Sequence, residues 1–157
     1  MNIKRSLVDI DDEDVQVEVK GGVVYVSISD KLLYQSGSSK INESAEEVIG
    51  KIAAVVNDHE ELNILVEGHT DDVPIANSCV DDNWDLSVKR ATSVVRMLQT
   101  EYFVSPERLT AAGRSEFVPK ELNTTPQGRS ANRRTEIIIT PRLDQFFQLL
   151  ESPIIAD

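Results

Sequence analysis

Cysteine and histidine are scarce in this chain of 157 residues. Cys79 is the single cysteine, which excludes an internal disulfide and any zinc site built on several thiolates. The two histidines are His59 and His69, and neither belongs to an HExxH motif; the EF-hand pattern is also absent. We therefore expect no metal and no cofactor.

Long hydrophobic runs and excess positive charge are also missing. No stretch approaches the ~18 apolar residues that a membrane span requires. The formal net charge is −11, which argues against nucleic acid or an anionic membrane surface as the main partner, because both repel an acidic protein. With 40% hydrophobic and 27% charged residues, the composition is that of a globular protein.

Motifs of nucleophilic catalysis and nucleotide binding are absent as well. The chain has no GxSxG elbow, and Gly21-Gly22 lacks the further glycines of a phosphate loop. Asp71 and Asp72 form a carboxylate pair, but adjacent residues that leave a strand point in different directions. We expect no enzymatic activity, and hydrolysis through Asp71 is the weakest of the alternatives.

What is present is a pattern of short strands and amphipathic helices. Valines that alternate on both sides of Gly21-Gly22 predict a β-hairpin over 15–29. Helical spacing predicts helices over 43–58, with Ser44 and Glu47 as a capping box, and over 86–101. Further strands are predicted over 62–67, 108–112 and 135–140, with a short helix from Thr125-Pro126 to about Asn132.

This order of elements predicts an α+β fold, a two-layer β/α/β/α/β-β sandwich with a mixed sheet and helices on one face. Residues 15–141 form the predicted domain. Residues 1–14 form a lead-in segment that contains the acidic run "DIDDED", and this composition allows the segment to be disordered. Residues 142–157 are predicted to form a closing helix at "LDQFFQLL" and a tail.

Positive charge gathers in one part of the acidic chain. The segment 108–142 holds seven basic and three acidic residues, so it is net +4. Its arginines predict a docking site for an anionic group. Arg90 is a separate candidate, because it lies at the edge of the apolar stripe of the second helix, where its head group can face a cleft. The basic residues of the segment are Arg108, Arg114, Lys120, Arg129, Arg133, Arg134 and Arg142.

Four motifs in one order resemble the OmpA C-terminal-like domain, which Pal lipoproteins and flagellar stator MotB proteins share. They are "LVEGHTDDVPI", "NWDLSVKRATSVVRML", "RLTAAGRSEFVP" and "NTTPQGRSANRRTEIII", and the resemblance covers about residues 23–140. The Val-Pro-Ile after the aspartate pair and the "NW-x-LS" form are most similar to MotB-type proteins and related lipoproteins.

The resemblance implies non-covalent binding of peptidoglycan through the diaminopimelate residue of its stem peptide. That residue presents an ammonium and a carboxylate on one carbon, and an Asp with an Arg supplies an acceptor and a planar donor fork for them. Lysine would match the carboxylate less well, because it lacks the fork. The residues that the resemblance assigns to this pocket are Asp71, Arg90, Asn83, Thr70, and Arg133 or Arg134.

The first loop departs from the family pattern. Gln35 stands where an Asp is frequent, and Gly37 stands where an Asn often contacts the ligand. That contact then comes from backbone N–H groups of residues 37–39, which include Gly37 and Ser38, or it is missing. The loop 71–83 is long and carries Asp81 and Asp82, which could repel carboxylates or help to select the ammonium.

The resemblance further implies a periplasmic module whose full-length protein is tethered to the outer membrane. Two alternatives stay open: a MotB-type stator anchor, and an OmpA-like interaction module that has lost peptidoglycan binding. Expected partners are the stem peptide and envelope proteins, with homodimerisation left open.

Overall fold

The computed structural model describes residues 14–34, 39–141 and 150. The predicted closing helix at 143–150, apart from Leu150, and nearly all of the acidic lead-in lie outside the described residues. Within them, no helix is both long enough and apolar enough to cross a membrane. The elements are β1 (Val15–Lys20), β2 (Val23–Ser29), α2 (Asp30–Leu33), α3 (Glu43–Asn57), β3 (Leu62–His69), α4 (Asn83–Thr100), the 3-10 turn η1 (Pro106–Arg108), β4 (Leu109–Gly113), α5 (Pro126–Asn132) and β5 (Arg134–Pro141).

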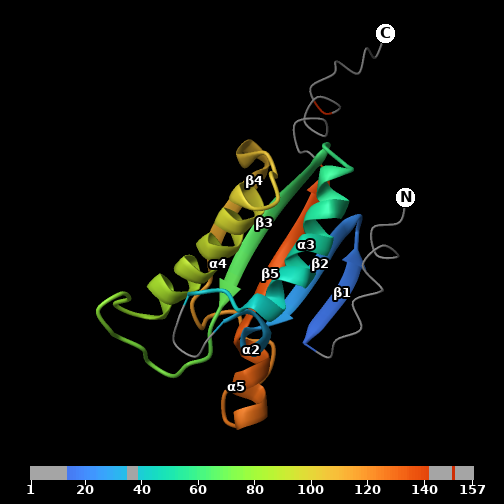
Figure 1. Cartoon of the computed structure of the whole chain (residues 1–157). Coiled ribbons are helices and arrows are strands. Elements are labelled where there is room, and N and C mark those ends of the chain that lie inside the picture. The colour runs from blue at the N-terminus through green and yellow to red at the C-terminus, as the bar shows by residue number, and fades with distance from the viewer. Residues whose placement is uncertain (1–13, 35–38, 142–149, 151–157) are drawn as a thin grey trace.

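The strands form one mixed sheet in the order β1-β2-β5-β3-β4 (Figure 1). Neighbouring strands are antiparallel except β3 and β4, which are parallel and joined through α4. Gly21 and Gly22 both have positive φ angles, 57° and 80°, as the tight turn between β1 and β2 requires. The predicted hairpin is confirmed.

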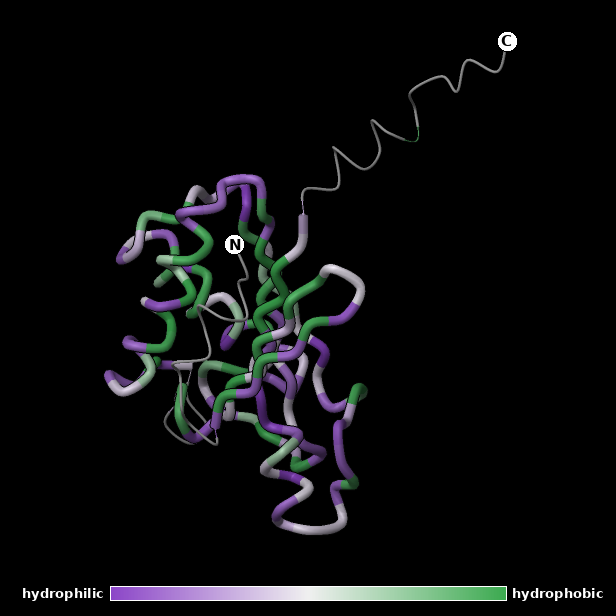
Figure 2. Tube along the Cα trace, turned by 90° about the vertical axis from the view of Figure 1, so that its right-hand side faces the viewer, coloured by the Kyte–Doolittle hydropathy of each residue, from purple (hydrophilic) through white to green (hydrophobic). Residues whose placement is uncertain are grey.

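Helices α3 and α4 lie against the same face of the sheet and form the second layer (Figure 1). Figure 2 views the sheet nearly from its edge. Apolar segments run along the strands, and the helices lie on one side of the sheet. The predicted α+β sandwich is confirmed. The largest fully buried side chains at the interface of the layers include Val26, Ile28, Ile49, Ile52, Val56, Ile64, Val66, Leu98, Ile137 and Ile139.

Several element ends differ from the sequence prediction. Helix α3 begins at Glu43 with Asn42 as N-cap and no side-chain cap hydrogen bond, so Ser44 lies inside the helix and the predicted capping box is wrong. Helix α4 begins three residues earlier than predicted, because the Asp82 carboxylate accepts a hydrogen bond from the Asp85 backbone N–H and caps it. The four-residue helix α2 was not predicted, since one turn is too short to show a period.

Arg108 holds the ends of three elements together from a buried position. Its Nε donates to the Leu62 carbonyl at 2.8 Å, and its Nη2 donates to the Val56 and His59 carbonyls at 2.6 and 2.8 Å. The last turn of α3 contains no basic residue, so this distant arginine satisfies carbonyls that the helix end leaves without an internal partner. Arg108 therefore belongs to the framework rather than to an anion-binding surface.

Gly68 sets how closely α4 approaches β3. A Cβ added at Gly68 would lie 2.1 Å from the backbone oxygen of Ser87, and one added at Gly113 would lie 2.5 Å from the Ser87 hydroxyl. The helix therefore rests directly on the backbone of the two parallel strands. The Ser87 hydroxyl also accepts a hydrogen bond from the Ser115 N–H at 3.1 Å, which ties the turn after β4 to the same helix.

We expect Arg108→Met to lower the free energy of unfolding by roughly 2–3 kcal/mol, because buried carbonyls lose a charged donor while the apolar volume is kept. Urea denaturation measures the change. Arg96→Ala is the matched control, since Arg96 is exposed on α4, and it should shift stability by less than about 0.5 kcal/mol. Equal effects of the two substitutions would contradict the role given to Arg108.

We expect Gly68→Ala to destabilise the fold by roughly 1–3 kcal/mol, because the new methyl group meets backbone that cannot move without separating α4 from β3. Gly50→Ala is the control: its Cβ would meet only the Tyr102 side chain, at 3.2 Å, and alanine favours the α3 helix by about 1 kcal/mol. Thermal unfolding of both variants tests the difference. A stability loss at Gly50 as large as that at Gly68 would argue against a special contact at Gly68.

Candidate functional site

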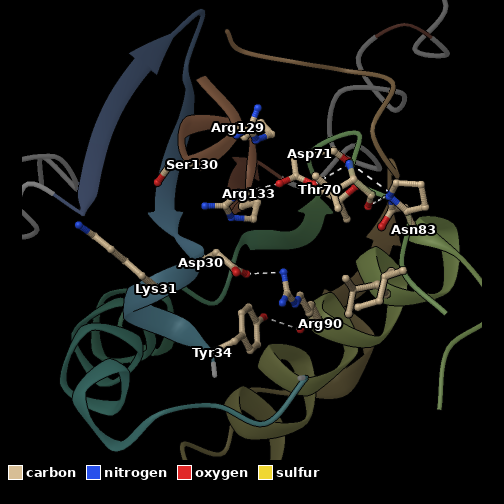
Figure 3. Close-up of a pocket in the computed structure, with 14 residues that line it drawn as sticks. Asp30, Lys31, Tyr34, Thr70, Asp71, Asn83, Arg90, Arg129, Ser130 and Arg133 are labelled. Atoms are coloured by element: carbon tan, nitrogen blue, oxygen red, sulfur yellow. Dashed lines mark hydrogen bonds and ion pairs between the residues drawn. The ribbon is translucent and has the colours of Figure 1, made fainter. Parts of the chain in front are cut away.

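A cavity of about 570 Å³ opens where β2 and β3 end, between α4 and α5 (Figure 3). Its walls come from α2, the loop after β3, the first two turns of α4, and the α5 segment that runs into β5. The polar and charged residues that line it are Asp30, Lys31, Tyr34, Thr70, Asp71, Asn83, Arg90, Arg129, Ser130 and Arg133.

Asp71 is held in place at the start of the loop that follows β3. Its Oδ1 accepts a hydrogen bond from the Val73 N–H at 3.0 Å, and its Oδ2 pairs with Arg133 Nη1 at 2.6 Å. The Asn83 side-chain amide donates to the backbone carbonyls of Asp71 and Val73. The Thr70 hydroxyl donates to the Asp71 carbonyl. Asn83 and Thr70 therefore shape the loop, and the Asp71 carboxylate faces the cavity.

Arg90 lies on the opposite side of the cavity and forms a second ion pair. Its Nη1 pairs with Asp30 Oδ1, and its guanidinium carbon lies 5.1 Å from the centre of the Tyr34 ring. The Tyr34 hydroxyl donates to the Arg90 backbone carbonyl at 2.7 Å. Figure 3 shows Arg90 next to Asp30 and Tyr34, with a dashed line to each. Only 4% of the Arg90 side chain is exposed, against 37% for Arg133, so Arg133 is the more accessible guanidinium.

The charges of Arg90, Arg133 and Asp71 all act on the buried carboxylate of Asp30. Burial raises its pKa above the ordinary value, while the positive charges of Arg90 and Arg133 act in the opposite direction. The negative charge of Asp71 adds a smaller upward contribution to this pKa. Burial also raises the pKa of the Tyr34 hydroxyl, which therefore stays protonated and able to donate. The two ion pairs thus form one electrostatic unit.

Most residues that the sequence singled out meet at this cavity. Asp71, Arg90, Asn83, Thr70 and Arg133 all line it. Asp71 and Arg90 do not pair with each other, because each has its own partner of opposite charge.

The remaining predicted site residues lie elsewhere or are not described. Arg134 points away: its Nη2 donates to the Val118 carbonyl, and its Nε pairs with Glu136 at 3.1 Å. Gly37 and Ser38 lie outside the described residues. Asp81 and Asp82, expected near the same ligand, line a different cavity.

The predicted convergence of arginines holds for two of them. Arg129 and Arg133 line the cavity, whereas Arg108 is buried in the framework. Arg114 lies 3.4 Å from Glu67 in an ion pair on another part of β3. Arg142 lies outside the described residues. The basic composition of the segment 108–142 therefore predicted more arginines at one site than the fold brings together.

Asp30, Lys31, Tyr34 and Ser130 are polar residues of the cavity that the sequence analysis missed. Asp30 comes directly after Ser29, the last residue of β2. A carboxylate at the end of a predicted strand was therefore a signal that the sequence contained. Nothing in the sequence showed that β2 lies two places from β3 in the sheet, which brings this strand end near Arg90.

Among the described residues, one group has the composition of a metal site. The ligand atoms of Glu67, His69 and Glu136 lie within 4.8 Å of one another. His69 Nε2 lies 2.8 Å from Glu67, and this hydrogen bond holds the pKa of the Glu67 carboxyl below its ordinary value. Arg114 and Arg134 pair with the two glutamates. Because these arginines already balance the carboxylates, the group is explained as a structural ion-pair cluster.

Comparison with known proteins places this geometry in a family. The model of the OmpA family matches residues 33–133. The Motility protein B of Bacillus subtilis (strain 168) is 34% identical over 117 residues, which cover 74% of this chain and 45% of that protein. The chain thus spans about half the length of this relative.

Solved structures agree with the sequence match. The cell wall anchor of the T6SS from Pseudomonas aeruginosa has a TM-score of 0.82 at 32% identity, over 90% of this chain and 98% of that one. A MotB-like protein from Desulfovibrio vulgaris has a TM-score of 0.81 at 28% identity, over 89% and 90% of the two chains. From its sequence motifs, its fold and these matches, the chain belongs to the OmpA family.

Proposed function

We propose that this domain is a non-enzymatic anchor that binds peptidoglycan through the cavity between β3, α4 and α5. Membership of the OmpA family and the likeness to a cell wall anchor support the proposal. The proposal rests on a single observation. Two ion pairs, Asp71 with Arg133 and Asp30 with Arg90, line the same cavity. Two acceptors and two guanidinium donors facing one space suit a ligand that carries both charges.

The ligand group that fits this arrangement is the diaminopimelate residue of the stem peptide. Its ammonium would be received by the Asp71 carboxylate and its carboxylate by a guanidinium. Arg133 is the first guanidinium that a guest would meet, because it is half-buried while Arg90 is almost fully buried in contact with Asp30 and Tyr34. Arg90 then supplies positive charge from the other side of the cavity and keeps Asp30 balanced.

The charge of the cavity favours such a ligand over a simple cation. Its lining holds four basic residues (Lys31, Arg90, Arg129, Arg133) and two acidic ones (Asp30, Asp71), which gives +2. The whole chain carries −11. A carboxylate-bearing peptide is therefore drawn to this part of an otherwise repelling surface.

The same domain could serve more than one kind of envelope protein. The relative Motility protein B supports a stator-type anchor, and Probable lipoprotein YiaD of Escherichia coli (strain K12), 27% identical, supports a lipoprotein. In either setting we propose that the full-length protein is membrane-tethered and that this domain lies in the periplasm or the equivalent wall space. Titration of the isolated domain with stem peptides tests the binding step apart from that setting.

We expect a stem peptide with diaminopimelate to bind at least roughly tenfold more tightly than the same peptide with lysine, because lysine lacks the second carboxylate and offers Arg133 no acceptor from the ligand. Isothermal titration calorimetry measures both affinities. Amidation of the diaminopimelate carboxylate should reduce binding to the level of the lysine peptide. Equal affinity for all three peptides would remove the diaminopimelate assignment while leaving peptidoglycan binding open.

We expect Asp71→Asn and Arg133→Ala each to weaken stem-peptide binding by roughly ten- to a hundredfold, because each removes one charge-assisted hydrogen bond. Arg90→Ala should abolish binding, but it also leaves Asp30 buried without its partner, so its thermal stability must be measured alongside. Arg96→Ala on the exposed face of α4 is the control and should bind as the wild type does. Wild-type affinity in both Asp71→Asn and Arg133→Ala would refute this site.

A further inference from the structure

A second cavity, of about 580 Å³, lies next to the first. The two share Pro74, Ile75 and Asn83 in their linings, so the loop after β3 forms a common wall. Asp71 lines the first cavity and Asp72 the second. The two adjacent aspartates thus face different spaces, and the second space has no part in the site described above.

An exposed aromatic pair forms one wall of this second cavity. The rings of Trp84 and Phe117 lie with their centroids 5.4 Å apart and their planes tilted by 38°. Both remain open to solvent, with exposed fractions of 50% and 62%. Trp84 comes from the first turn of α4 and Phe117 from the turn after β4. Two large aromatic side chains left this accessible typically mark a binding surface.

The turn that carries Phe117 is fixed in an uncommon conformation. Ser115 has a φ of 53°, in the left-handed region that few residues other than glycine adopt. Its carbonyl accepts a hydrogen bond from the Thr70 N–H at 2.9 Å, and its N–H donates to the Ser87 hydroxyl. Phe117 is therefore positioned beside Trp84 by contacts to β3 and α4, without needing a ligand to order it.

The remaining charged groups of the second cavity are all acidic. Asp72, Asp81, Asp82 and Glu116 line it, and no lysine or arginine is among its lining residues. This composition disfavours an anionic ligand and also a second copy of the chain, because the same acidic groups would face one another across a two-fold interface. Carboxylates accept hydrogen bonds from hydroxyl groups, and aromatic rings pack against apolar faces.

We propose that the second cavity binds a neutral N-acetylated sugar of the peptidoglycan glycan strand, with the sugar ring stacked on Trp84 and Phe117. The carboxylates around the cavity accept hydrogen bonds from the sugar hydroxyls. The shared wall then lets one ligand occupy both cavities, with its peptide in the first and its sugar in the second. The proposal deepens the function proposed above and rests on it.

The test uses the intrinsic fluorescence of Trp84, which is the sole tryptophan of the chain. We titrate the protein with tetra-N-acetylchitotetraose, a neutral sugar oligomer without peptide. A saturable change of the tryptophan emission is expected, weakened at least roughly tenfold in Phe117→Ala. Phe103→Ala is the matched control, because Phe103 is 83% exposed beyond the other end of α4, and it should respond as the wild type does.

Calorimetry with Trp84→Ala separates this proposal from the peptide site. This variant should lose the sugar oligomer and keep wild-type affinity for the sugar-free stem peptide, whereas Asp71→Asn should do the reverse. The sugar site is overturned if the tryptophan emission does not change on adding the sugar oligomer, or if Trp84→Ala binds the sugar oligomer as the wild type does. Either result stands even if the peptide still binds. An emission that changes with protein concentration alone assigns the aromatic pair to self-association and overturns it as well.

Discussion

The close approach of α4 to β3 is the constraint on which the site depends. Gly68 leaves no space between the strand and the backbone of Ser87, so the helix is seated directly on the sheet. Asp71 follows three residues after Gly68, and Arg90 follows three residues after Ser87. One backbone contact therefore fixes both sides of the cavity, and the Ser115 turn is tied to the same place through the Ser87 hydroxyl.

Balanced charge is the second organising feature. An isolated buried arginine or aspartate would cost several kcal/mol of desolvation, and here Arg90 with Asp30 and Asp71 with Arg133 avoid that cost by pairing. The pairs also differ in exposure, since Arg133 reaches solvent and Arg90 does not. Under the proposed function, the more exposed pair would exchange partners with a guest, while the buried pair would keep its arrangement.

Much of the fold was accessible from sequence because its elements have strong local signals. The Gly21-Gly22 hairpin, the apolar stripe of α3 and the Thr125-Pro126 start of α5 all appear as expected, with Thr125 accepting a hydrogen bond from the Gly128 N–H. Signals that depend on one residue's position were less reliable. The Ser44 capping box fails because the N-cap is Asn42, two residues before Ser44, and α2 is too short to be recognised.

From the sequence by itself came the residue types expected at the site: through the family resemblance, its ordered motifs assigned Asp71, Asn83, Arg90, Thr70 and either Arg133 or Arg134 to one pocket. Only the tertiary structure decided the pairing. Asp30 lies 60 residues before Arg90 in sequence, and the sheet order brings it there. Arg133 is the C-cap residue of α5 and Arg134 is the first residue of β5, and the fold directs Arg133 to Asp71 in the cavity and Arg134 to Glu136. Residue types alone allow either aspartate to pair with either arginine. The fold decides the pairing, because it brings Asp30 to Arg90 and Asp71 to Arg133.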